Sequence, residues 1–565
     1  MRYFPANQAH LTMLRSSLLA FVSLLFTCSL MAQDYSSAWK NITELQQKGK
    51  YRSALEATNG LYEVARRNGD DDTQLKALFH RAQYTQQLEE DGFEAMIDLL
   101  ESSLSDSPAP AFRAVNHFVL GRAYSAYLVQ AQGRGTAAQA ELTGEQPLAE
   151  WPLERIANTA TDHLLQALDL ARENEVLLSD IPAIVQTGER LGYQMPTLYD
   201  VLVYQALDQL TANDGYLIGP AYAYRPAAST LFAPAQDFIE ANFAAVDSSL
   251  LGRSLKIYQD LLAYHQKADR SAAFLHVNLK RLEWAFRQVA DEEAYFERLQ
   301  ALLPLYRKNR DGGAILLKQV QLIQQFPSLG AAGEDDKPKA RMLDMLKTIQ
   351  AEYPKTEAAQ LARFKEIDLL TPRLSLRTEE VLLPNQHALV FVSYRNAEQL
   401  YYRLYPSEFK LGYAEPQATK KILKGQAIQS ARVSLGRNDD YNDHQTELAL
   451  SPLQPGAYTL LVSSNPDFNV EQSPVAQKEL VVSQLAALSI GGQETTKLQA
   501  VDRLTGTILP GLSAKLYRWN DDYRNRKLIL LDEVTTDTKG QLTLPETPRN
   551  ITVVTSSSKM SLRLR

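Results

Sequence analysis

The stretch LQAVDRLTGTILPGLSAKLY, from Leu498 to Tyr517, predicts two β-strands joined by a hairpin. Leu498 and Ala500 lie two residues apart before the turn, and Ala514 and Leu516 do so after it. This spacing is the period of a half-buried strand. Glycine tolerates positive φ and proline fixes φ, so the Thr-Gly and Pro-Gly pairs between the strands are turn formers.

A second turn sequence follows, Thr-Asp-Thr-Lys-Gly at 536–540, and Leu542 and Leu544 alternate after it. Strands separated by turns at intervals predict an antiparallel β-sandwich. If Gly506 occupies the left-handed region, replacing it with Val should destabilise the protein by about 1 kcal/mol or more, because a β-branched residue resists positive φ.

The chain before residue 371 has a helical period instead. Between Ser36 and Leu370 apolar residues recur every three or four positions, and stops such as Asn68-Gly69 separate the segments. Short paired helices with alanine at their crossing points predict an irregular solenoid or bundle of helical hairpins. Pro196 is expected in the first turn of one of these helices, and Phe232 to Ile239 is expected to be helical.

At Thr371-Pro372 the period changes to two, as in Val390 and Val392 and again in Tyr458 and Leu460. The predicted fold class is therefore α+β and multidomain: N-terminal helical hairpins followed by two antiparallel β-sandwich domains. The predicted limits are 1–32 for a signal peptide, 33–130 for a helical hairpin region, 151–370 for a second helical region, and 372–487 and 488–565 for the two sandwiches.

Three segments between these elements are predicted loops. Gln130 to Glu150 and Pro327 to Pro338 are rich in helix breakers and polar residues, and limited proteolysis should cut first within 131–150 and 327–338. Tyr216 to Tyr224 concentrates tyrosines around Gly219-Pro220. These rings either stack on sugar or cover the seam between two helices, and covering is the favoured interpretation.

Composition excludes several classes of protein. The 565 residues carry 59 basic and 66 acidic side chains, a net charge of −7, so nucleic-acid binding has no electrostatic support. The hydrophobic fraction of 45% suffices for large cores. Cys28 is the single cysteine, so the chain can form neither an internal disulfide nor a cysteine-based metal site.

The N-terminus predicts export. Leu18 to Leu30 is apolar, follows Arg15 and precedes Ala32, and it is too short to span a membrane as a helix. This pattern is typical of a secretory signal peptide cleaved after Ala32. The alternative is a lipoprotein signal cut before Cys28, although Thr27 stands where a smaller residue is usual.

No catalytic, cofactor-binding or metal-binding residues are predicted. The Asn438 to His444 loop lacks the central glycine and final glutamate of an EF-hand, and the carboxylate pair Glu89-Glu90 has no feature that would shift its pKa. Phosphate-loop, dinucleotide and Gly-x-Ser-x-Gly motifs are absent. None of the histidines has the paired spacing of a zinc site; they are His10, His80, His117, His163, His265, His276, His387 and His444.

The order of elements resembles the N-terminal part of bacterial alpha-2-macroglobulin-like proteins, a family of large envelope protease traps. The hairpin residues that match are Asp502, Arg503, Thr505, Gly506, Leu509 and Gly511. The Thr-Asp-x-x-Gly turn, the Pro384 to Asn396 segment with its Tyr-Arg-Asn end, and Pro455 to Tyr458 add to the likeness. The resemblance covers nearly all of the mature chain and implies macroglobulin-type, Ig-like sandwiches and endopeptidase inhibitor activity.

The chain also departs from that family. Members that trap proteases covalently carry a Cys-x-Glu-Gln thioester far downstream, which acylates a nucleophile after proteolysis. The Glu-Gln pairs here begin at Glu145, Glu398 and Glu471, and none has a cysteine two positions earlier. This polypeptide therefore has no thioester of its own. It also lacks the family's later macroglobulin, bait and thioester domains, which implies a truncated or a split gene product.

Three functional hypotheses follow. The leading one is a non-enzymatic envelope protein of the periplasm or outer membrane, or secreted, that forms the N-terminal scaffold and docking part of such an inhibitor. Its partners would be proteases, later macroglobulin domains or a partner chain, with membrane association open. The alternative is an outer-membrane glycan-binding lipoprotein with helical repeats, acylated at Cys28. A surface hydrolase is third, without a catalytic constellation in its favour.

Overall fold

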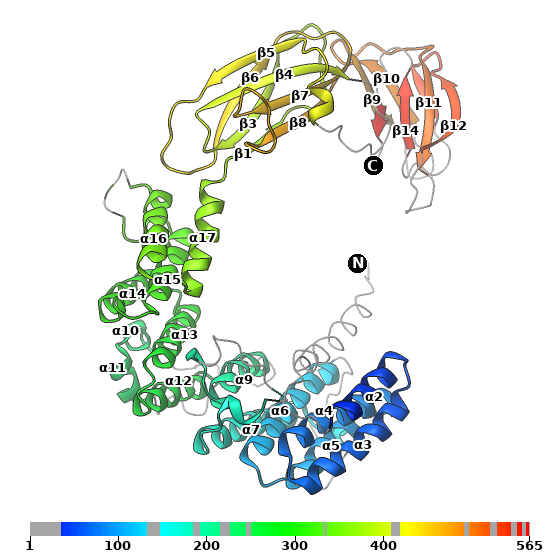
Figure 1. The fold of residues 1–565 in the computed structure, drawn as a ribbon. Coiled ribbons are helices and arrows are strands. Elements are labelled where there is room, and N and C mark those ends of the chain that lie inside the picture. The colour runs from blue at the N-terminus through cyan, green and yellow to red at the C-terminus, as the bar shows by residue number, and fades with distance from the viewer. Residues whose placement is uncertain are drawn as a thin grey trace. The chain divides into compact units, whose positions relative to one another are not determined.

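The fold is that of a computed structural model, shown in Figure 1, whose chain divides into two compact units, Met1–Leu305 and Tyr306–Arg565. The predicted domain limits stay predictions. The structure describes the following residues: 35–132, 147–182, 184, 193–214, 226–243, 250–331, 333, 336–407, 419–490, 497–519, 528–543, 551–555 and 561–563. The Tyr216 to Tyr224 segment and most of the 130–150 loop lie outside them.

The first unit is helical, as its period predicts. Its elements are α2 (Ser36–Gln47), α3 (Tyr51–Asn68), α4 (Asp71–Leu88), α5 (Gly92–Ser102), η1 (Ser103–Ser105), α6 (Pro110–Gln132), η2 (Leu148–Glu150), α7 (Leu153–Glu173), η3 (Leu178–Asp180), α9 (Leu198–Asp214), α10 (Ala228–Leu231), α11 (Ala235–Glu240), α12 (Leu250–Lys267), α13 (Ser271–Val289) and α14 (Glu292–Tyr306).

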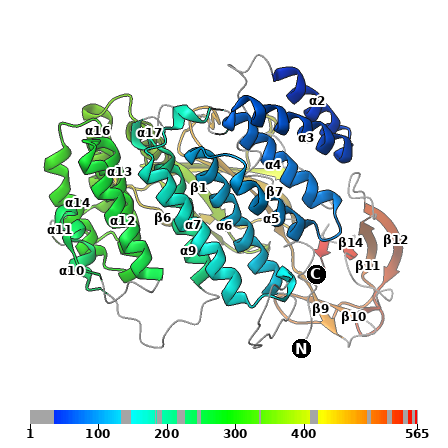
Figure 2. The ribbon, with the colours of Figure 1, turned by 90° about the horizontal axis from the view of Figure 1, so that it is seen from below.

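Helix α6 lies directly along α7, as Figures 1 and 2 both show. The contact face of α7 contains Ala157, Ala160 and Leu164, all fully buried. A Cβ added at Gly121 of α6 would lie 2.7 Å from Leu164 Cγ and 2.9 Å from the carbonyl oxygen of Ala160. The two helices therefore approach closely because one of them has no side chain at the crossing.

Two helix assignments made from the sequence are wrong in detail. Pro196 does not lie in the first turn of α9; it precedes Thr197, whose N–H and Oγ1 both donate to Asp200 Oδ2, at 2.9 and 2.7 Å. A side-chain cap thus starts this helix in place of proline. The Phe232 to Ile239 segment is also not one helix, because Pro234 separates α10 from α11.

The second unit begins with three helices: α15 (Gly312–Gln325), α16 (Pro338–Glu352) and α17 (Glu357–Leu370). Thr356 caps α17, since its Oγ1 accepts from Ala359 N–H at 3.1 Å. Only Thr371 and Pro372 separate α17 from the first strand.

The first sandwich contains β1 (Arg373–Arg377), β2 (Val381–Leu382), β3 (Ala388–Arg395), β4 (Gln399–Ser407), the short helix α18 (Thr419–Ile422), β5 (Gln429–Ser434), β6 (His444–Leu450), β7 (Gly456–Ser463) and β8 (Val475–Val482). One sheet has the order β1-β3-β6 and the other β2-β8-β7-β4-β5. All pairings are antiparallel except β2 with β8, which is parallel and was not predicted.

Both faces of β7 are buried, and this explains why its sequence is almost continuously apolar. Leu460 and Val462 point into the core between the sheets. Leu461 packs on the opposite face with Ile422 of α18 and Phe468 of the loop before β8. The larger sheet therefore carries an outer layer that the alternation of strand residues did not reveal.

The second sandwich contains β9 (Leu485–Ile490), β10 (Lys497–Asp502), β11 (Ser513–Trp519), β12 (Leu528–Thr535), β13 (Gln541–Thr543), β14 (Ile551–Thr555) and β15 (Ser561–Arg563). Its antiparallel sheets have the orders β13-β10-β9 and β12-β11-β14-β15. The predicted core residues Leu498, Ala514, Leu516 and Leu542 are buried together. The α+β fold class with two β-sandwiches is therefore confirmed.

Valine at Gly506 is expected to destabilise the second sandwich by about 1 kcal/mol or more. Gly506 has φ +72°, and a Cβ there would meet no heavy atom within 4 Å, so the cost is backbone strain alone. Urea unfolding followed by circular dichroism measures the change. Asparagine tolerates the left-handed region better, so Gly506→Asn should cost less than Gly506→Val. Equal losses in the two variants would contradict a conformational cause.

Candidate functional site

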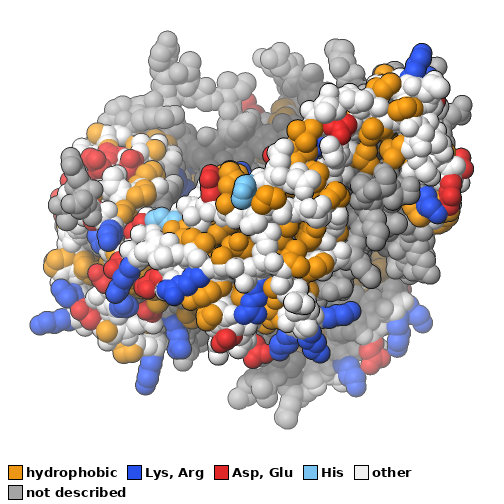
Figure 3. All heavy atoms as spheres, turned by 90° about the horizontal axis from the view of Figure 1, so that it is seen from above, with side chains coloured by type: hydrophobic (Ala, Val, Ile, Leu, Met, Phe, Trp, Pro, Cys, Tyr) orange, Lys and Arg blue, Asp and Glu red, His pale blue; other side chains and the backbone are white. Residues whose placement is uncertain are grey.

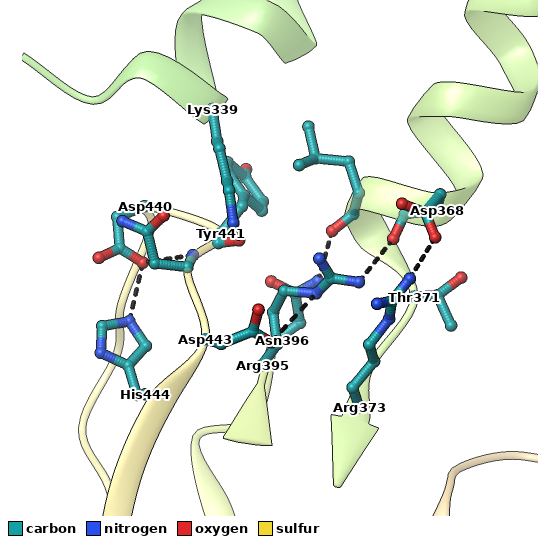
Figure 4. A network of polar contacts seen from close by, with 12 residues as sticks. Lys339, Asp368, Thr371, Arg373, Arg395, Asn396, Asp440, Tyr441, Asp443 and His444 are labelled. Carbon is teal, nitrogen blue, oxygen red and sulfur yellow. Dashed lines mark hydrogen bonds and ion pairs between the residues drawn. The ribbon is translucent and has the colours of Figure 1, made fainter. Parts of the chain in front are cut away.

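The clearest built feature of the second unit is the joint between α17 and the first sandwich (Figure 4). At the end of β3, Arg395 donates from Nη2 to the carbonyl oxygen of Asp368 at 2.9 Å. The neighbouring Asn396 donates from Nδ2 to the carbonyl oxygen of Leu369 at 2.8 Å. These are the arginine and asparagine of the predicted Tyr-Arg-Asn segment, and they come together on the last turn of α17.

This arrangement satisfies groups that a helix cannot satisfy itself. The last carbonyls of a helix have no partner inside it and carry its negative dipole end. Arg395 is 5% exposed and its cationic side chain supplies both a donor and a charge of the right sign. Its nearest carboxylate, on Asp443, is 4.0 Å away, so the carbonyl of Asp368 is the closer partner. The sandwich thus acts as the C-cap of the helix.

Further contacts surround this joint. Lys339, on α16, donates from Nζ to the carbonyl oxygen of Tyr441 at 3.1 Å. Arg373 forms an ion pair with Asp368 at the surface. The strand β1 that Arg373 opens and the 435–443 loop containing Tyr441 both belong to the sandwich, so three of its segments contact two helices.

The Asn438 to His444 loop, whose sequence does not match an EF-hand, contributes to the same region and uses its carboxylate oxygens internally. Asp440 Oδ1 accepts from Asn442 N–H at 3.0 Å and lies 2.9 Å from His444 Nε2. Burial opposes ionisation of Asp440, but the hydrogen bonds from Asn442 and His444 outweigh burial and lower its pKa. Among the described residues no group of three or more acidic, histidine or cysteine side chains is arranged to hold a metal ion.

A second joint connects the two sandwiches. Ser483 and Gln484 alone separate β8 from β9. Arg503, in the hairpin after β10, donates its backbone N–H to the carbonyl oxygen of Gln484 at 2.7 Å. Its guanidinium also hydrogen-bonds the carbonyl oxygen of Val381 and pairs with Glu379 at 3.2 Å. The arginine of the Asp-Arg-x-Thr-Gly hairpin therefore holds the second sandwich to the first.

Asp502 sets the shape of that hairpin. Its Oδ1 accepts from the N–H groups of Leu504 and Thr505 at 3.0 and 2.9 Å. The hydrogen bond from Thr505 N–H is the main reason why the pKa of Asp502 is lowered. The N–H of Gly506 closes the turn on the carbonyl oxygen of Asp502 at 2.8 Å. The conformation of the turn places Arg503 against the first sandwich.

The Thr-Asp-x-x-Gly turn is tied to the same hairpin. Thr536 is buried, and its Oγ1 donates to the carbonyl oxygen of Leu509 at 2.7 Å and accepts from Leu512 N–H at 2.9 Å. Asp537 Oδ1 accepts from the N–H groups of Lys539 and Gln541, both at 2.8 Å. The two motifs found in the sequence therefore form one structural unit. Both are turn chemistry, and neither brings together groups suited to catalysis.

Several histidines have partners that sequence reasoning missed. His117 on α6 and His163 on α7 face each other, with 2.9 Å between their Nδ1 atoms. His265 Nε2 lies 2.6 Å from Asp200 Oδ1, and both side chains are buried. His80 is buried beside Trp39, and burial lowers its pKa to about 3. No short spacing in the sequence signals these contacts, because each joins different helices.

Figure 3 shows one face of the surface, with basic side chains along its lower edge. On the face in Figure 3, hydrophobic side chains lie between separated acidic and basic ones. Within the described part of the chain, no helix has the length and apolarity that crossing a membrane would need.

Comparison with known proteins gives structural neighbours. No family model and no curated protein matches the chain. A structure of native alpha-2-macroglobulin from Escherichia coli spanning domains MG0-NIE-MG1 matches with a TM-score of 0.26 and 13% identity, covering 34% of this chain and 64% of that one. This chain thus spans less than two thirds of the length of that neighbour.

Two further solved structures match the same share of the chain. A fragment of the same protein spanning NIE-MG1 matches with a TM-score of 0.24 and 14% identity, covering 34% of this chain and 97% of that one. Salmonella alpha-2-macroglobulin reacted with methylamine matches with a TM-score of 0.17 and 12% identity, covering 34% and 16%. The weak structural neighbours of this chain are therefore bacterial alpha-2-macroglobulins, and likeness at this level assigns no activity.

Proposed function

We propose that the chain is a non-enzymatic protein of the bacterial cell envelope, the N-terminal scaffold and docking part of an alpha-2-macroglobulin-like protease inhibitor. The observation that carries this proposal is the pair of joints in the second unit. At the first joint Arg395 and Asn396 of the sandwich cap α17. At the second joint Arg503 bonds to the carbonyl of Val381. The described titratable side chains at these joints form contacts that position one module against the next.

Short connectors support the same proposal. Where two residues link consecutive modules and side chains bridge the link, the modules are positioned by more than the covalent chain. A protein built this way can present surfaces at fixed separations, which is what a scaffold for later domains or a partner chain requires. The hairpin and the Tyr-Arg-Asn segment resemble alpha-2-macroglobulin-like proteins, so we propose the scaffold role within that family. The apolar run that ends before Ala32 supports export.

This polypeptide is expected to form no covalent complex with proteases. The only thiol, on Cys28, lies in the segment whose removal we predict, and if it is retained at a lipoprotein terminus its sulfur carries lipid. We would incubate residues 33–565 with several proteases, with and without methylamine, and separate the products on denaturing gels. The expected result is no high-molecular-weight adduct and no effect of methylamine. An adduct stable to denaturation would contradict the proposal.

A further inference from the structure

The histidine pair between α6 and α7 stands apart from the joints. His117 and His163 approach with their Nδ1 atoms 2.9 Å apart. The ring of Tyr124 stacks on His163 at 5.7 Å and 10°, and Trp151 stacks on Tyr124 at 6.0 Å and 11°. Trp151 follows η2, outside the two helices, and Arg155 lies 3.7 Å from its ring centroid. The pair is thus the inner end of an aromatic stack that reaches a segment before α7.

The distance between the two Nδ1 atoms indicates whether a metal ion or a hydrogen bond joins the histidines. Two imidazoles on one tetrahedral zinc ion, each at ~2.0–2.1 Å, would place their nitrogens roughly 3.3 Å apart. A separation of 2.9 Å is instead the usual length of a hydrogen bond between nitrogens or between nitrogen and oxygen. One ring must then carry a proton on Nδ1 and the other must accept it, so the two histidines have different tautomers when both are neutral.

Charged groups face the pair from three helices. They are Arg113 on α6, Glu101 on α5 and Asp162 on α7. Burial lowers the pKa of His117 to about 4, with His163 and Arg113 adding to the effect. Burial also lowers the pKa of His163, against the opposing attraction of Glu101 and Asp162. Glu101 also accepts a hydrogen bond from the hydroxyl group of Tyr124.

We propose that this histidine pair is an acid-sensitive latch between α6 and α7, a property that goes beyond the proposed scaffold role. With no added proton or with one, a single hydrogen occupies the line between the Nδ1 atoms and the latch is closed. A second proton puts an N–H on both nitrogens and two positive charges on rings that touch. The rings must then separate, and the stack that supports Trp151 is lost.

The direction of the pH effect follows from the lowered pKa of His117. The unfolded chain takes up a proton near the ordinary histidine pKa of about 6.5, whereas the folded latch resists it. The stability that the latch contributes is therefore complete above about pH 6.5 and is lost progressively as the pH falls toward about 4. Opening of the latch in the folded protein needs that proton to bind, so it centres near the lowered pKa of His117, at about 4.

Fluorine NMR of the full chain labelled with 5-fluorotryptophan tests this inference. The chain has four tryptophans, and Trp151→Phe assigns the reporter resonance. Between pH 7 and about 3, in buffer with a chelator, we expect the Trp151 resonance to move with a single transition centred near the lowered pKa of His117, at about 4. The Trp284 resonance, from a ring packed on Tyr258 in α12, should show the chain still folded over that range. The Trp39 resonance reports the titration of the neighbouring His80, so that effect is read separately from the latch.

Two variants and one control complete the test. His117→Gln and His163→Gln should each abolish the Trp151 transition, since glutamine cannot be protonated, and the folded state of each is checked on the Trp284 resonance. His444→Gln, in the first sandwich, should leave the transition unchanged. The inference is overturned if wild type shows no transition, if His117→Gln retains it, or if added Zn²⁺ at constant pH reproduces it in the absence of chelator.

Discussion

Alanine in place of Gly121 is expected to destabilise the protein by about 1–3 kcal/mol, whereas the same change at Gly60 is expected to stabilise it by about 0.5–1 kcal/mol. Both glycines lie inside helices, Gly60 in α3 and Gly121 in α6. The same Gly→Ala change is thus expected to alter the free energy of unfolding in opposite directions at the two positions. The difference comes from the atoms that surround each glycine.

Gly60 faces open space. A Cβ there would meet no heavy atom within 4 Å, so alanine removes conformational freedom from the unfolded chain without a steric cost. At Gly121 the added Cβ would lie 2.7 Å from Leu164 Cγ and 2.9 Å from the backbone oxygen of Ala160. A leucine side chain can shift a little, but the backbone of α7 moves only with the helix. The α6–α7 crossing must therefore widen, with loss of packing along both helices.

Urea unfolding of the two variants, followed by far-ultraviolet circular dichroism, measures both changes against the wild type. Because the chain has two units, the transition assigned to the helical unit is the one to compare. Stabilisation by Gly121→Ala, or destabilisation by Gly60→Ala of similar size, would contradict the close crossing described for α6 and α7.

Methionine in place of Arg281 is expected to destabilise the protein by about 3–5 kcal/mol. Arg281 on α13 is fully buried without a carboxylate partner among its hydrogen bonds. Its Nη1 donates to the carbonyl oxygen of Leu231 and its Nη2 to that of Ala233, both at 2.9 Å. Asn278 Oδ1 accepts from Nε and Nη2. Methionine fills much of the volume but leaves these oxygens buried and unpaired.

The carbonyls that Arg281 satisfies belong to the break between α10 and α11, where Pro234 prevents a continuous helix. Gln259 satisfies carbonyls at the C-terminal end of α11, since its Nε2 donates to the carbonyl oxygens of Phe238 and Ala241 at 2.9 and 2.8 Å. Burial lowers the pKa of Arg281 to about 9, with Arg298 adding to the effect, so the guanidinium remains charged at neutral pH.

Arg287→Met on the same helix provides the matched control. Its side chain is 61% exposed and pairs with Glu283 at 3.6 Å, so its replacement should change the free energy of unfolding by about 0.5 kcal/mol or less. Thermal or urea unfolding of both variants gives the comparison. A loss for Arg281→Met no larger than that for Arg287→Met would show that the α10–α11 carbonyls find other partners.

The sequence predicted what depends on short-range patterns. Val390 and Val392 alternate and are buried, because a strand at the sandwich core must turn every second side chain inward. Gly506 and Gly511 both have φ +72°, as their turn positions require. The change from helix to strand after Leu370 was visible for the same reason, since burial on one face imposes a period on each element.

The sequence did not predict contacts that join distant segments. The separation of His117 and His163 is 46 residues and that of Arg281 and Leu231 is 50, and no local pattern encodes either pair. The parallel pairing of β2 with β8 is likewise set by the return of the chain after about a hundred residues. Arg395 and Asn396 were noticed in the sequence, but their role as a cap depends on where α17 ends.

The central claim is that the caps from Arg395 and Asn396 hold the first sandwich in one orientation on α17, with Lys339 of α16 adding a contact to the same joint. Pulsed electron spin resonance between labels at Lys347→Cys on α16 and Glu447→Cys on β6, with Cys28→Ser, measures this directly.

We predict a single narrow distance distribution, which the double variant Arg395→Ala/Asn396→Ala broadens and the exposed Arg437→Ala leaves unchanged. A broad distribution with the caps intact, or no change on removing both caps, would contradict the account.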